Sequence, residues 1–104
     1  MHTDLSRPFR PIELNRETLA SFSLPSLAED LKSEAEYERS GVSAVTLTRD
    51  EHVTSVLVAL RKGALMRHHR APSAATVVLL SGRVRFFAGD GAGTALEPGA
   101  LTAF

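Results

Sequence analysis

The stretch "VSAVTLTRDEHVTSVLVAL", residues 42–60, contains two runs of β-branched and apolar residues separated by a short polar segment. Runs of this kind, bounded by turn residues, are typical of β-strands, and they predict strands over 42–48 and 53–60. The same composition returns in "ATVVLL" (75–80) and "RVRFFA" (83–88). No helical pattern separates these four strands, so we expect an all-β, mainly antiparallel arrangement, as in a sandwich or barrel.

The segments between these strands carry turn signals. Ser81-Gly82 separates two apolar runs by two residues, which predicts a tight β-hairpin. The segment "AGDGAG" (88–93) is a Gly-rich turn, because it lacks the lysine and the following helix of a phosphate-binding loop. Glu97-Pro98-Gly99 predicts another turn, and "ALTAF" predicts the start of a further strand.

Upstream of the strands the pattern differs. Pro8 and Pro11 indicate an extended N-terminal arm, which we expect to contribute one edge strand at most. One helix is predicted over about 27–39. We therefore expect a single structural domain, with the arm and helix in residues 1–41 and the β-rich part in residues 42–104.

The helix prediction depends on its ends and on one apolar face. Ser26 followed by Glu29 has the spacing of a capping box. Leu27 and Leu31 fall on the same helical face, whereas the acidic residues of the segment fall mainly elsewhere and predict a solvated surface. Gly41 stands where a helix would end.

Composition limits the possible functions. The chain has 104 residues, a formal net charge of zero and no cysteine. The charge balance gives no reason to expect nucleic acid or an acidic membrane as a partner, and the lack of cysteine excludes disulfides and thiolate ligands. No apolar run approaches the roughly 20 residues needed to span a bilayer, and the N-terminus has no apolar signal-peptide core. We expect a cytoplasmic protein.

A spaced set of glycines and one histidine surrounds "LRKGALMRHHRAP", residues 60–72. Gly63 is followed by five residues and then His69, and Gly82 closes the pattern. A later "ALEPGAL" contains Gly99 directly after Pro98. Over residues 42–104 this pattern resembles the first motif, and the opening of the second motif, of small single-domain cupins. The resemblance implies a jelly-roll β-barrel of the cupin type, which would be incomplete here.

The cupin resemblance also implies a metal held by histidines and a glutamate inside the barrel. Its first histidine corresponds to His69, but its second corresponds to Ala71 and its glutamate to Ala75. The chain reaches Phe104 before the position of the last ligand. The resemblance thus implies a degenerate metal site. The remaining histidines, His2 and His52, are expected in the arm and in a surface turn.

Strand geometry separates the two adjacent histidines. Successive side chains of a strand point to opposite faces, so His68 and His69 do not converge on one ion without a bulge. If His69 faces the barrel interior, Arg67 shares that face while Arg70 lies on the other. An Arg67–His69 pair suits a small carboxylate or phosphate. The alternative is that both side chains lie at a solvated strand end and bond to neighbouring groups.

These features favour a non-catalytic or small-molecule-binding cupin-like domain without a required cofactor. No catalytic triad is present, so catalysis without metal has no candidate residues. The alternative is a metal-dependent isomerase or dioxygenase that binds Zn, Fe, Mn or Ni through His69 and His68, with help from another chain. A third interpretation is a structural or regulatory dimer without a pocket. Because cupins continue beyond the strand at "ALTAF", an exposed edge and apolar interior would remain, and we expect a homodimer.

Overall fold

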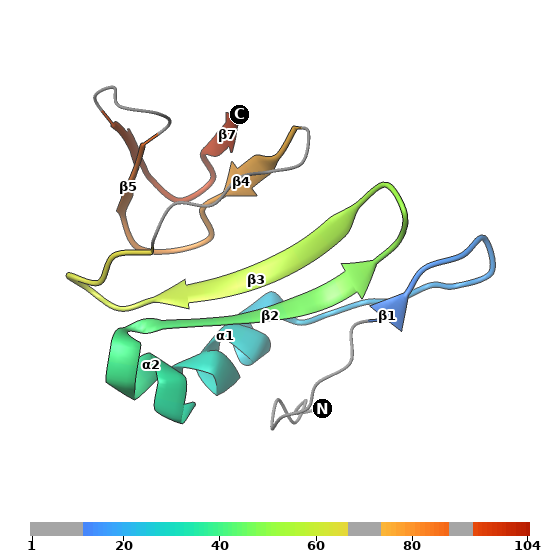
Figure 1. The fold of residues 1–104 in the computed structure, drawn as a ribbon, viewed down its shortest axis with the longest axis horizontal. Helices are drawn as coiled ribbons and strands as arrows, with labels where there is room; N and C mark the ends of the chain where they lie inside the picture. Colours follow the sequence, from blue (N-terminus) through green and yellow to red (C-terminus); the bar gives the residue numbers. More distant parts are fainter. Residues whose placement is uncertain (1–11, 67–73, 88–92) are drawn as a thin grey trace. The chain divides into compact units, whose positions relative to one another are not determined.

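The computed structural model describes residues 12–66, 74–87 and 93–104 (Figure 1). The chain divides into two compact units, an N-terminal unit of Met1–Arg67 and a C-terminal unit of His68–Phe104. Among the described residues, strands outnumber helices and most strand pairs are antiparallel. The described strands form three separate sheets rather than one closed barrel. The mainly antiparallel β class is therefore observed.

The N-terminal unit consists of a three-stranded sheet with helices against it. Strand β1 (Ile12–Glu13) pairs in parallel with β2 (Val42–Arg49), and β2 pairs antiparallel with β3 (Thr54–Leu60). The strands predicted over 42–48 and 53–60 are confirmed, and the arm contributes a two-residue edge strand. The five elements are β1 (Ile12–Glu13), α1 (Leu24–Lys32), α2 (Ala35–Ser40), β2 (Val42–Arg49) and β3 (Thr54–Leu60).

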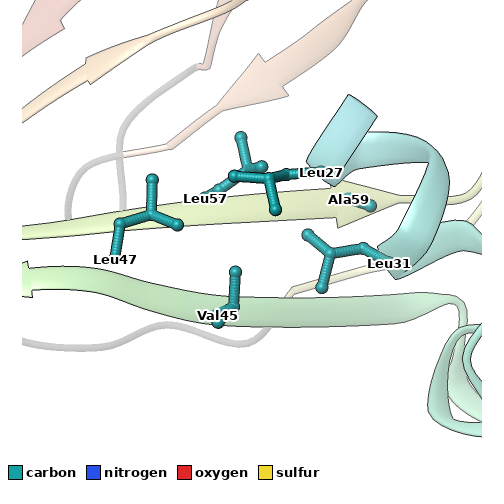
Figure 2. Packing of buried hydrophobic residues seen from close by; sticks show 6 residues of the cluster. All are labelled: Leu27, Leu31, Val45, Leu47, Leu57 and Ala59. Carbon is teal, nitrogen blue, oxygen red and sulfur yellow. The ribbon is translucent and has the colours of Figure 1, made fainter. Parts of the chain in front are cut away.

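The core of this unit lies between α1 and the β2–β3 hairpin. Leu31 is completely buried, and Leu27 of the same helix is 2 % exposed. They pack against Val45 and Leu47 of β2 and against Leu57 and Ala59 of β3, as Figure 2 shows. The i, i+4 spacing of the two leucines places both on one helical face. That face is the one predicted from the sequence.

The expected single helix over 27–39 is wrong, because the segment forms two helices. Helix α1 begins three residues earlier than the proposed capping box requires, with Ser23 as its N-cap and no side-chain cap bond. It ends at Lys32, and the hydroxyl of the C-cap residue Ser33 donates a 2.8 Å hydrogen bond to the Asp30 carbonyl. Such local bonds compete with helix continuation. Glu34 then adopts an extended conformation, with ψ of 148°.

Two acidic side chains near the break between α1 and α2, those of Asp30 and Glu34, face the protein rather than solvent or bond to the sheet. The Ser43 hydroxyl of β2 donates a 2.6 Å hydrogen bond to the Glu34 carboxylate, which ties the break to the sheet. Asp30 is only 8 % exposed, so it does not belong to the solvated acidic face that the helix pattern predicted. The two helices are therefore positioned by the sheet as well as by their own sequence.

Helix α2 ends at Gly41, as predicted. Gly41 has φ of 82°, in the left-handed region, and its N–H donates a 2.9 Å bond to the Tyr37 carbonyl. A Cβ at this position would lie 2.6 Å from the Ala64 Cβ. Both the backbone conformation and the close approach therefore require glycine.

In the C-terminal unit the strands are short, and the first of them pairs with the last. The four strands are β4 (Thr76–Val78), β5 (Val84–Phe86), β6 (Thr94–Leu96) and β7 (Leu101–Ala103). Strand β4 pairs with β7, and β5 pairs with β6, both antiparallel. The rings of Phe86 and Phe104 lie 4.9 Å apart between centroids, and Leu96 is the unit's most buried apolar residue among those described.

The hairpin predicted at Ser81-Gly82 is wrong. These residues form a bend between β4 and β5, which belong to different sheets. The β4–β7 ladder continues instead through Leu79, whose N–H bonds to the Ala100 carbonyl and whose carbonyl accepts from Gly99. Two-residue spacing allows a hairpin, but it does not by itself decide which strands pair. The Glu97-Pro98-Gly99 turn and the strand within "ALTAF" are confirmed.

Replacing Leu31 with alanine should destabilise the protein by about 2–5 kcal/mol, because the truncated side chain leaves a cavity in the core. Urea denaturation followed by circular dichroism would measure this change. Leu19→Ala is the matched control, since Leu19 is 96 % exposed; its effect should stay within about 0.5 kcal/mol. Equal effects of both substitutions would contradict the assigned core.

Gly41→Ala should destabilise the protein by more than Gly63→Ala. Both glycines have φ near 80°, so alanine costs about 1–2 kcal/mol of backbone strain at either position. Only Gly41 has a close neighbour, since a Cβ on Gly63 would meet no atom within 4 Å. The difference between the two free energies of unfolding thus measures the contact with Ala64. A larger effect at Gly63 would contradict this packing.

Candidate functional site

The candidate ligand-binding residues belong to the segment between β3 and β4. Arg67, His68 and His69, together with Ala71, lie outside the described residues. On the near side, the chain leaves β3, turns at Lys62-Gly63 and reaches Leu65, which is 76 % exposed. On the far side, the described chain resumes at residue 74. The structure therefore describes both ends of this segment, whereas the proposed pairing of Arg67 with His69 stays a prediction.

Ala75 stands at the glutamate position of the cupin pattern, and its backbone is fully used in the sheet. Its N–H donates to the Phe104 carbonyl, and its carbonyl accepts from the Phe104 N–H, both at 2.9 Å. A methyl side chain offers no metal ligand or proton donor. Ala75 therefore extends the β4–β7 ladder rather than contributing to chemistry.

The three glycines of the cupin-like pattern share one backbone property. Gly63, Gly82 and Gly99 have φ of 81°, 80° and 90°, and a Cβ on any of them would meet no atom within 4 Å. Glycine is thus required at these positions by conformation rather than by space. Gly63 precedes the candidate segment, and the other two flank β5 and β6. The glycines of the cupin-like pattern therefore stand at positions where the backbone adopts a left-handed conformation.

The turn between β2 and β3 is organised by Asp50. Its carboxylate accepts 2.8 Å hydrogen bonds from the backbone N–H groups of His52 and Val53, and these bonds lower the pKa of Asp50 below its ordinary value. Its own N–H donates to the Val53 carbonyl at 2.9 Å. His52 is exposed in this turn, as predicted, with its Nε2 3.2 Å from the Glu51 carboxylate.

An open depression of about 480 Å³ adjoins this turn. Its lining combines three carboxylates with one guanidinium. No group of three or more His, Cys, Asp or Glu side chains within the described ranges could hold a metal ion. We therefore assign no metal site to this depression, which is lined by Glu13, Leu14, Arg49, Asp50 and Glu51.

Arg61 has a role that the sequence does not indicate. It is one of several basic residues in the second half of the chain, but its guanidinium donates to the carbonyls of Tyr37 and Glu38 at 3.3 and 2.7 Å. These carbonyls belong to helix α2, where a cation and donor are favourable at the C-terminal end. The sequence could have indicated this role only indirectly. Because β3 runs antiparallel to β2, its end returns to Gly41, and Arg61 therefore lies at the C-terminal end of α2.

Other polar contacts in the described part of the C-terminal unit are exposed. Arg83 lies 3.5 Å from the Glu97 carboxylate, and both side chains are largely exposed. Arg85 donates a 3.3 Å bond to the Gly93 carbonyl. Such exposed pairs contribute little to stability, and they place no nucleophile beside a base. Neither helix in the described part of the chain is long and apolar enough to cross a membrane.

Comparison of the chain with protein-family models, with curated proteins and with solved structures finds no match.

Asp50→Ala should lower the melting temperature at neutral pH, because the backbone N–H groups of His52 and Val53 lose the carboxylate that accepts their hydrogen bonds. Since the pKa of Asp50 is lowered in the folded state, its contribution is full above the ordinary aspartate value of about 3.9. It is lost as the pH falls through the lowered value. Melting curves from pH 7 to pH 2 should show the difference between wild type and Asp50→Ala shrinking with acidification.

Asp50→Asn is the control, because its amide oxygen accepts hydrogen bonds without titrating. The difference between Asp50→Asn and Asp50→Ala should not change over the same pH range. A wild-type advantage that stays constant to pH 2 would contradict the assigned role of the Asp50 charge.

Proposed function

We propose that residues 42–104 form a cupin-like domain that binds a small anion and does not catalyse a reaction. The observation that supports this proposal is the set of left-handed turns at Gly63, Gly82 and Gly99. Turns at these spacings are what a cupin-like strand arrangement would need. The three glycine turns thus support matching the residues between Gly63 and Gly82 to the cupin pattern position by position.

Under this proposal, Arg67 and His69 contact the ligand. Side chains two residues apart on a strand share one face, so both would face the same space. A guanidinium binds a carboxylate or phosphate through two parallel hydrogen bonds, and an imidazole adds a third donor. Arg70, on the opposite face of an extended strand, would not reach that ligand.

The residues also explain why we propose binding rather than metal chemistry. A zinc-type site needs about four ligands, three or more of them from protein. The positions corresponding to two of the cupin ligands carry Ala71 and Ala75. Because Arg67 and Arg70 flank the histidines, an added cation would meet two like charges. An anion would be attracted by the same charges.

Arg67→Ala should weaken anion binding by about 10- to 150-fold, the loss expected for a hydrogen-bonded charged contact of about 1.5–3 kcal/mol. Isothermal titration calorimetry of the full chain with a panel of organic acids and sugar phosphates would measure it. Arg70→Ala is the matched control and should bind normally. Unchanged binding in Arg67→Ala, or an equal loss in Arg70→Ala, would reject the assignment.

The same preparations test the metal-dependent alternative. Elemental analysis should be made on protein purified without an affinity tag. Stoichiometric Zn, Fe, Mn or Ni that disappears in His69→Ala would overturn the metal-free proposal.

A further inference from the structure

Strand β3 has an unused hydrogen-bonding edge in the described part of the chain. The sheet order is β1-β2-β3, so β3 pairs on one side only. The Arg61 N–H bonds to the Gly41 carbonyl, and the Asp50 N–H bonds to the Val53 carbonyl. Both bonds show which residues of β3 face β2. The odd-numbered residues bond to β2, and the even-numbered residues direct their N–H and C=O groups to the free edge. The outward residues are Thr54, Val56, Val58 and Leu60.

Nothing in β3 blunts this edge. Edge strands of soluble proteins are commonly protected by charged residues, proline or a bulge. The segment "TSVLVAL" has no charge and no proline, and the one irregularity of the hairpin lies in β2, between Thr46 and Thr48. Val56 and Val58 are 52 % and 38 % exposed on the sheet face opposite α1. The edge is therefore long, regular and apolar.

We propose that a second copy of the chain pairs with this edge, strand β3 against strand β3, in an antiparallel two-fold arrangement centred on Leu57. In this register Val56 lies opposite Val58 of the second copy, and Thr54 lies opposite Leu60. All of these residues carry outward N–H and C=O groups, so every outward group from Thr54 to Leu60 finds a partner. Registers centred on Val56 or Val58 leave some of these groups unpaired at the strand ends.

The register also agrees with the side-chain faces. Residues directly opposite in a sheet point to the same face, and the two-fold axis runs perpendicular to the sheet. The α1 helices of both copies therefore stay on one face, with their cores unchanged. The valines of the two copies pack together on the other face. The product is a continuous six-stranded sheet made from two three-stranded ones.

Charge selects this partner and this direction. Glu51 precedes β3 and Lys62 follows it, while Asp50 and Arg61 at the same two ends also make hydrogen bonds within their own chain. Antiparallel pairing places the acidic end of each copy beside the basic end of the other. Parallel pairing would place like charges together at both ends, which is destabilising. A second copy thus supplies both the matching apolar strand and the complementary charges.

Val58→Pro should convert the protein from dimer to monomer in sedimentation analysis of the full chain. Proline removes the outward N–H of Val58, but no bond to β2, and proline is tolerated at strand edges. Val58→Ala is the matched control, because it shortens the side chain and keeps the N–H; it should remain dimeric. Circular dichroism should show both variants folded. A wild-type chain that is monomeric at all concentrations tested would overturn the proposal.

A second experiment tests the register even where Val58→Pro fails to fold. The chain has no native cysteine, so Ser55→Cys combined with Ala59→Cys introduces the only thiols. In the proposed register, position 55 of each copy faces position 59 of the second copy, in the closely spaced, non-hydrogen-bonded type of pair. Mild oxidation should give a disulfide-linked dimer of the double variant and of neither single variant. A dimer that persists in Val58→Pro and does not cross-link in the double variant would reject this interface.

Discussion

The packing of Leu27 and Leu31 across the β2–β3 hairpin is the interaction on which the N-terminal unit depends. A two-stranded hairpin is marginally stable in water without a layer against its apolar face. Helix α1, nine residues long, is likewise too short to be stable alone. Each element therefore becomes stable by burying the apolar face of the other. Leu57 and Ala59 contribute to this contact from β3, which places that strand accurately relative to the helices.

Several polar contacts depend on this packing and reinforce it. The hairpin closes through the Asp50 carboxylate, and its return strand delivers Arg61 to the end of α2. Gly41 allows the chain to leave α2 and enter β2 beside Arg61, in space that a side chain would occupy. Helix α2, the turn at Asp50 and strand β3 are thus connected by successive contacts. Within the described part of the N-terminal unit, the other edge of β3 takes no part in these contacts, and it is the edge that we propose pairs with a second copy.

The candidate site was only partly predictable. The strand positions, the turn at Glu97-Pro98-Gly99 and the surface position of His52 follow from local sequence, and the structure agrees. The sequence also shows alanine at positions 71 and 75. An alanine side chain cannot bind a metal in any conformation, so this conclusion does not require a structure. The role of Arg61 could not be read in this way. Its partners, Tyr37 and Glu38, lie more than 20 residues away, and only the antiparallel return of β3 brings them together.

The sequence by itself determined where the chain is extended, where it turns, and which leucines form the apolar face of α1. These properties depend on side-chain shape and on backbone preferences over a few residues. Tertiary structure alone decided which strands pair: Ser81-Gly82 allowed a hairpin, yet β4 joins β7 and β5 joins β6. It also decided the break between α1 and α2 and the burial of Asp30. The reason is that three-residue strands carry too little local information to choose a partner, so β4 pairs with β7, more than 20 residues away, rather than with the neighbouring β5.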